Sequence, residues 1–95
     1  MTVPGNGDRV PRMRALLEAA FAPDRLEITD DSHRHVGHAG ARDGRGHFSV
    51  DITSAAFDGL GAVARHRAVY AVLEDMMRND IHALAIRARA PAEPA

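Results

Sequence analysis

The sequence predicts a domain of the α/β class (α+β) with the element order α-β-β-α-β, in which helices pack on one face of a three-stranded mixed sheet. Two segments repeat their apolar residues at the helical spacing, and three segments alternate apolar and polar residues as half-buried strands do. The 95 residues suffice for one core and not for two. The first two strands pair antiparallel, and a helical crossover makes the last strand parallel to its neighbour.

The first helix is expected over residues 8 to 21. Asp8 is a suitable N-cap, Pro11 is tolerated in the first turn, and Pro23 ends the helix. At about 100° per residue, one side of the helix collects the apolar side chains Val10, Met13, Leu17, Ala20 and Phe21.

Both ends of the chain are rich in proline, glycine and alanine. Residues 1 to 7 and 91 to 95 hold little that a core would bury, so both segments are expected to be disordered. The domain is therefore expected to span residues 8 to 90.

Two strands are expected over residues 25 to 31 and 47 to 54, joined by a long loop. Each shows the period of two that is typical of a strand with one buried face. The residues expected to face the core are Leu26, Ile28, Phe48, Val50 and Ile52.

A second helix is expected over residues 62 to 79, after a turn marked by two glycines. Its apolar stripe is expected to consist of Val63, His66, Val69, Tyr70, Leu73 and Met77. His66 would then lie within the buried face, where a histidine is most often a core residue with a satisfied ring nitrogen.

The last strand is expected to start at Ile81. Alternation places His82, Leu84 and Ile86 on one face. The opposite face would carry Ala83, Ala85, Arg87 and Arg89.

The loop between the first two strands, DDSHRHVGHAGARDGRGH at residues 30 to 47, contains most of the histidines. It holds four of the six, and the chain has no cysteine. Its glycines allow a close approach to a ligand, and neutral imidazole is a common metal ligand that needs no thiol. The sequence therefore indicates a metal or cluster arm, for which any thiolates must come from a partner.

Composition and motifs argue against several functions. The net charge of −1 gives no overall positive field for nucleic acid or acidic membrane. All 12 basic residues are arginine, which indicates a compositional bias and weakens arginine count as evidence. Ser/His/Asp spacing, a P-loop and an HExxH motif are absent, and so small a domain can hardly enclose a pocket, so an enzyme is not expected. Without a leader or membrane-spanning run, the protein is expected to be cytoplasmic.

Several motifs together resemble those of the BolA family. FDGLGAVARHRAVYAVL at residues 57 to 73, followed by IHALAI at 81 to 86, resembles the family's F-x-G turn, R-H-R-x-V-Y helix and late strand that begins with a histidine. DDSHRH at 30 to 35 resembles the start of the loop before the family's second strand. The match extends over about residues 9 to 90 in the same order and spacing.

The resemblance implies a KH-like αββαβ domain that pairs with a monothiol glutaredoxin. The two proteins would share a 2Fe-2S cluster, in iron-sulfur trafficking or iron sensing. The thiolates would come from a glutaredoxin cysteine and glutathione. The chain alone is expected to carry no cluster and to be a monomer or weak homodimer.

The resemblance also implies which histidines bind the cluster. His82 matches the ligand of the last strand and His35 the ligand of the loop, with His38 as a substitute in the same flexible segment. Taken without the resemblance, His82 reads as a histidine packed on the apolar face and His35 as a solvated loop residue. His33 and His47 are weaker candidates, and alternation places His47 opposite the core, where it is expected to be exposed.

Arg65 and Arg67 flank the expected apolar stripe of the second helix. By default both are solvated helix charges, and their functional alternative is contact with a partner's carboxylates or with phosphate. Nucleic-acid binding by a transcriptional regulator therefore stays open as a second function. The KH-like topology and this arginine pair favour it, and the near-neutral charge opposes it.

Overall fold

The computed structural model describes residues 6 to 32 and 46 to 93, and its elements follow the predicted order. They are α1 (Asn6–Phe21), β1 (Arg25–Asp30), β2 (Gly46–Thr53), the short 3-10 helix η2 (Ala55–Phe57), α3 (Ala62–Val72), α4 (Glu74–Asn79) and β3 (Ile81–Arg89). The strand order is β1-β2-β3, with β1 antiparallel and β3 parallel to the central β2. The predicted fold class and sheet topology are confirmed.

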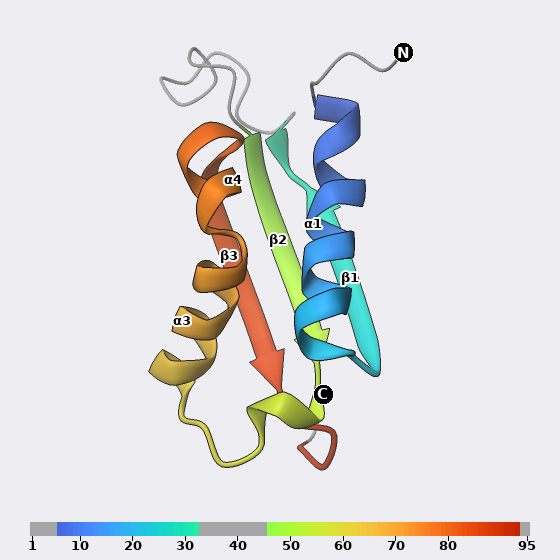
Figure 1. The fold of residues 1–95 in the computed structure, drawn as a ribbon, viewed down its shortest axis with the longest axis vertical. Coiled ribbons are helices and arrows are strands. Elements are labelled where there is room, and N and C mark those ends of the chain that lie inside the picture. The colour runs from blue at the N-terminus through green and yellow to red at the C-terminus, as the bar shows by residue number, and fades with distance from the viewer. Residues whose placement is uncertain (1–5, 33–45, 94–95) are drawn as a thin grey trace.

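The helices lie on one face of the sheet, and the opposite face is open (Figure 1). In β2, buried and half-buried residues alternate along the whole strand, so the buried set points toward the helices. None of the helices in the two described stretches is long and apolar enough to cross a membrane. The core between sheet and helices consists of Met13, Leu17, Phe48, Val50, Ile52, Phe57, Val69, Leu73, Met76 and Ile81.

An ion-pair cluster joins the first turns of α1 to the start of β3. Asp80 binds Arg9 Nε at 3.2 Å and Arg12 Nη2 at 3.0 Å, and Arg9 is buried. Burial acts to raise the pKa of Asp80, but the hydrogen bonds and charges of Arg12 and Arg9 outweigh it and hold that pKa below its ordinary value. The backbone oxygen of Asp80 also accepts a hydrogen bond from the Gly46 amide, so the cluster fixes the end of the sheet where β2 and β3 begin.

A buried corner connects β2 to the helical crossover. The Ser54 hydroxyl donates to the Phe21 carbonyl at 2.6 Å and accepts from the Ala56 amide, so it caps η2. Phe57, at the end of η2, is fully buried with its ring 5.1 Å from that of Phe21. Gly59 follows with φ of +78°, a conformation that favours glycine. The F-x-G motif is thus the structural element that turns the chain from the sheet into α3.

The helix predicted over residues 62 to 79 is two helices that meet at Leu73. Its predicted buried face is confirmed at Val69 and Leu73, and Met77 is half-buried, but the face is wrong at three other positions. Val63 is 64% exposed, Tyr70 is 39% exposed, and His66 is exposed as well. The buried residues of this region are Val69, Leu73 and Met76. Alanine and valine surround the helix on most sides, so periodicity alone does not determine which side is buried.

The predicted face of His82 in the last strand also needs correction. Gly46 pairs with Ile81 and His47 pairs with Ala83, so His82 is an extra residue at an irregularity of the β2–β3 ladder. The alternation is interrupted there. His82 is exposed, while Leu84 and Ile86 are half-buried against the helices.

At both ends the structure differs from the expected domain limits. Helix α1 begins at Asn6, within the segment expected to be disordered. Residues 91 to 93 form a turn, and Glu93 accepts a hydrogen bond from the Ala90 amide. The turn is held by polar contacts, which a search for residues that a core would bury does not detect.

Candidate functional site

Two histidines lie side by side at the end of the sheet where β2 and β3 begin. The ring centroids of His47 and His82 are 5.1 Å apart, and the ring planes are inclined by 52°. His47 follows the alternation of β2 and faces the open side of the sheet, where it is half-buried. His82 reaches the same place because the irregularity in β3 interrupts its alternation.

Backbone hydrogen bonds hold His47 firmly. Its amide donates to Ser32 Oγ at 3.0 Å, and its carbonyl accepts from the Asp31 amide at 2.7 Å. The neighbouring Gly46 has no room for a side chain, because a Cβ there would lie 2.6 Å from Ser32 Oγ and 2.7 Å from the Phe48 ring. The backbone of His47 is therefore held at both its amide and its carbonyl, and the exposed His82 lies beside it.

A shallow groove of about 280 Å³ runs along the open face from His47. Asp31 contributes a carboxylate to it, and the Ser49 hydroxyl donates to Asp31 Oδ2 at 2.6 Å. A larger groove of about 380 Å³ continues across the strands and shares Ser49 and Ala85 with the first. The lining of the first groove is Asp31, His47, Phe48, Ser49, Ala83, Leu84 and Ala85.

The predicted ligand set is described only in part. His82 is exposed, while His33, His35 and His38 lie outside the described residues. The structure brings His82 together with His47, which the sequence ranked low. Among residues 6 to 32 and 46 to 93, no group of three or more metal-binding side chains is found. The alternation of β2 gives the face of His47, but the register that brings His82 beside it is not visible in the sequence.

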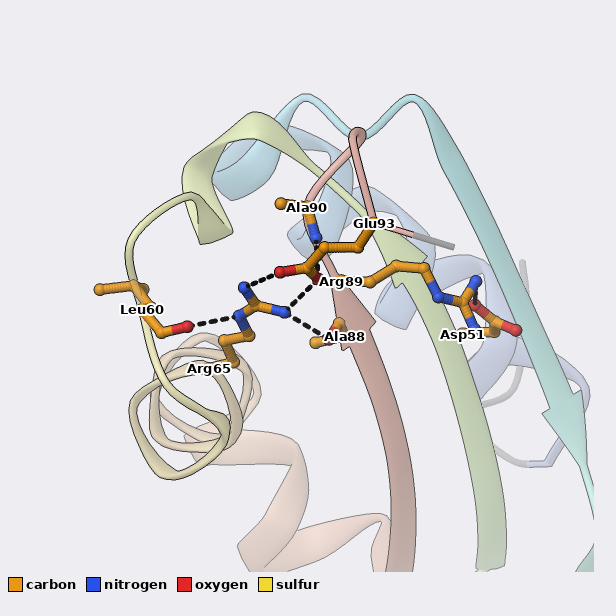
Figure 2. Close-up of polar contacts among 7 residues, drawn as sticks. All are labelled: Asp51, Leu60, Arg65, Ala88, Arg89, Ala90 and Glu93. Carbon is orange, nitrogen blue, oxygen red and sulfur yellow. Dashed lines mark hydrogen bonds and ion pairs between the residues drawn. The ribbon is translucent and has the colours of Figure 1, made fainter. Parts of the chain in front are cut away.

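Arg65 is not the solvated charge that the sequence predicts by default. Its side chain is only 13% exposed and points inward from α3 (Figure 2). Nε donates to the Leu60 carbonyl at 2.8 Å and Nη1 to the Ala88 carbonyl at 3.2 Å. Both terminal nitrogens bind the Glu93 carboxylate, at 2.6 and 2.7 Å. Arg67 is exposed, so of the two arginines it is the one available to a partner.

The Arg65–Glu93 pair is expected to stabilise the fold in a pH-dependent way. Hydrogen bonds from Arg65, and then from the Ala90 amide, lower the pKa of Glu93 from 4.5 to about 2. A lowered carboxyl pKa means that the stabilisation is complete above pH 4.5 and is lost as the pH falls through 2. Glu93→Gln should therefore lower the melting temperature at pH 7, and its deficit relative to wild type should shrink as the pH falls below 4.5.

The matched controls are the two arginine variants. Arg65→Ala is expected to lower the melting temperature at pH 7 and Arg67→Ala to leave it unchanged, both followed by far-ultraviolet circular dichroism. Equal melting temperatures for the two variants, or a Glu93→Gln deficit that is the same at pH 7 and pH 2.5, would contradict a stabilising role for the pair.

A family model described as BolA-like protein matches residues 17 to 93. SufE-like protein 1, chloroplastic/mitochondrial, of Arabidopsis thaliana is 44% identical over 92 residues, which cover 92% of this chain and 25% of that protein. The DNA-binding transcriptional regulator BolA of Escherichia coli (strain K12) is 39% identical over 75 residues, which cover 79% of this chain and 69% of that protein.

The fold is similar to solved structures as well. The BolA domain of SufE1 from Arabidopsis thaliana is 41% identical, with a TM-score of 0.84 over 95% of this chain and 100% of that domain. This chain therefore corresponds to one whole domain of a relative that is about four times as long.

Proposed function

The chain belongs to the BolA-like protein family, and from this we propose that it is an adaptor that pairs with a monothiol glutaredoxin and co-ligates a bridging 2Fe-2S cluster through histidine. Its role would lie in iron-sulfur cluster trafficking or iron sensing. The observation that carries the proposal is the exposed imidazole of His82 at the start of β3, in a chain that has no cysteine.

The side chains of this chain can supply half of the ligands of such a cluster. A 2Fe-2S cluster takes four protein or thiol ligands, and two imidazoles in place of two thiolates raise its potential. This chain would supply His82 and one histidine of the loop, His35 or His38, and the partner would supply cysteine and glutathione thiolates. The Asp80 cluster and the Gly46 contacts would keep the base of His82 in place while the partner docks.

Partner contact would also use the exposed side of α3. Arg67 and Tyr70 lie there beside a shallow groove completed by Ala71, Glu74 and Met77. An exposed guanidinium beside apolar surface is suited to a partner's carboxylates. Arg65 is not proposed for this role because its hydrogen-bonding capacity is used within the fold.

No catalytic step is proposed. A cytoplasmic location stays a prediction, since one relative is named chloroplastic/mitochondrial.

The test is reconstitution with a monothiol glutaredoxin, iron, sulfide and glutathione. The expected product is a heterodimer whose visible circular dichroism differs from that of the glutaredoxin homodimer loaded in the same way. A mixture that yields only the loaded homodimer and free partner would contradict the proposal.

Transcriptional regulation is the second candidate, favoured by the name of the Escherichia coli relative. With a net charge of −1, binding to duplex DNA is expected to be non-specific, with Kd of about 10⁻⁴ to 10⁻⁶ M at physiological salt, and to weaken as salt rises. The measurement is fluorescence anisotropy over a salt series with wild type and Arg67→Ala. Submicromolar, sequence-selective binding that Arg67→Ala removes would place regulation ahead of the adaptor role.

A further inference from the structure

We propose that two copies of this chain associate weakly through the outer side of α3 and α4, antiparallel and about a two-fold axis. The surface, called the α3 stripe, is largely exposed and includes the side chains around a shallow groove of about 360 Å³. Its occupant is a second copy of the chain, and the pairing does not depend on glutaredoxin. The residues of the α3 stripe are Leu60, Val63, Arg67, Tyr70, Glu74 and Met77.

The residues of the α3 stripe follow one another at intervals of three and four. This is the spacing by which two helices pack along a single seam. The helical hydrogen bonds continue across the junction, because the Leu73 amide donates to the Val69 carbonyl at 3.2 Å and the Leu73 carbonyl accepts from the Met77 amide at 2.8 Å. The two helices follow each other along β3 (Figure 1), so they present one line of side chains.

The α3 stripe concentrates the exposed apolar surface of the domain. Of the four large apolar side chains that are exposed in the described stretches, three belong to it, namely Leu60, Val63 and Tyr70. Val63 is the most exposed of them, at 64%. The Tyr70 hydroxyl donates to the Leu84 carbonyl at 3.3 Å, which holds the ring in place and limits the entropy that contact would cost. Covering this surface removes apolar area from water and favours association.

The charges of the α3 stripe favour a second copy as its occupant. The stripe carries one cation and one anion, Arg67 and Glu74, about 10.5 Å apart along the helix axis. When two antiparallel stripes overlap over their whole length, Arg67 lies level with Tyr70 of the second copy and one layer from its Glu74. A two-fold axis makes each of these contacts twice, so the surface is complementary to itself. A partner that carries charge of only one sign would leave Arg67 or Glu74 unmatched.

Glu74 already has one partner within the chain. Its carboxylate binds Arg78 at 2.6 Å, and both side chains are more than 60% exposed. An exposed ion pair of this kind contributes little to stability, so Glu74 can share its carboxylate with Arg67 of a second copy.

The size of the α3 stripe implies a weak dimer. Its 18 residues span about 27 Å, and a single pair of such helices is a smaller interface than the roughly 1,600 Å² of a standard one. Association is therefore expected with Kd in the range of about 10⁻³ to 10⁻⁵ M. Glutaredoxin is proposed to contact the same side of α3, and to the extent that this consequence rests on the proposed function, self-association would occlude docking.

The experiment is sedimentation equilibrium of the full chain alone at pH 7, from roughly 10⁻⁵ to 10⁻³ M. The mass of wild type should rise from that of a monomer toward that of a dimer. Arg67→Glu and Glu74→Arg each bring like charges together and should weaken association at least about tenfold. The double variant Arg67→Glu/Glu74→Arg exchanges the two charges, keeps the net charge of −1 and should restore association.

Two further variants control for net charge and for folding. Arg87→Glu makes the same change of charge at an exposed residue beside the groove of the open face, and should leave association unchanged. Val63→Asp places a charge at the most exposed apolar position of the stripe and should abolish association while the melting temperature stays that of wild type.

A wild type that stays monomeric at about 10⁻³ M would overturn the inference. So would association that persists in Val63→Asp, that Arg87→Glu weakens as much as Arg67→Glu does, or that the double variant does not restore. Because glutaredoxin is absent from this experiment, its failure leaves cluster formation intact, and failure to form the cluster leaves the dimer intact.

Discussion

Replacing His82 by alanine is expected to abolish the visible absorption and circular dichroism that distinguish the mixed complex from the glutaredoxin homodimer. An imidazole lost from the iron cannot be replaced by a thiolate of this chain, which has none. The His82 side chain is exposed, so far-ultraviolet circular dichroism and the melting temperature should remain those of wild type. Association with apo glutaredoxin, measured by calorimetry, should also persist.

The controls for this result use other histidines of the same chain. His66→Ala alters an exposed histidine of α3 and should preserve the spectra. His35→Ala should weaken them, and the additional change His38→Ala should remove what remains. Spectra that are unchanged both in His82→Ala and in the loop double variant would rule out histidine ligation by this chain.

Truncating Phe57 to alanine is expected to cost the largest amount of stability of any change considered. Phe57 is fully buried, packs on Phe21 and ends the η2 turn, so its removal leaves a cavity at the corner that Ser54 closes. Loss of a buried phenylalanine costs about 3–5 kcal/mol, a large part of the roughly 5–15 kcal/mol available to a small domain. For this size, each kcal/mol lowers the melting temperature by about 4–8 °C.

The measurement is urea unfolding followed by circular dichroism, with Val63→Ala as the matched control. Val63 lies on the next helix but is largely exposed, so its truncation should change the free energy of unfolding by no more than about 0.5 kcal/mol. A Phe57→Ala variant as stable as Val63→Ala would show that the F-x-G turn is not part of the core.

Strands proved easier to predict from this sequence than helix faces. The strand residues predicted to face the helices do so, namely Leu26, Ile28, Phe48, Val50 and Ile52. A strand has only two faces, and the polar residues of these strands mark the face that is not buried. The second helical region offers no such contrast. Its buried face is fixed by the junction at Leu73 and by the contacts of α3 and α4 with β3, which are tertiary features.

The site was predictable to a smaller extent. Exposure of His82 depends on the ladder irregularity opposite Gly46, and a single sequence does not reveal where a register shifts. The inward course of Arg65 depends on Glu93, 28 residues away and in a segment whose composition predicts disorder. Neither the exposure of His82 nor the direction of Arg65 could be predicted, because each depends on a pairing between segments that are distant in the chain.

The hydrogen bonds from α3 to β3 have a consequence for self-association. β3 is an outer strand of the sheet, and the Arg89 carbonyl, bonded to the Ser54 amide, shows which residues turn their backbone inward. The alternate residues Leu84 and Ala88 then present their carbonyls to the free edge, where Tyr70 Oη at 3.3 Å and Arg65 Nη1 at 3.2 Å occupy them. An edge with two of its acceptors occupied is a poorer template for strand addition than a bare one. Tyr70 and Arg65 are therefore expected to disfavour pairing of a second copy along the outer edge of β3.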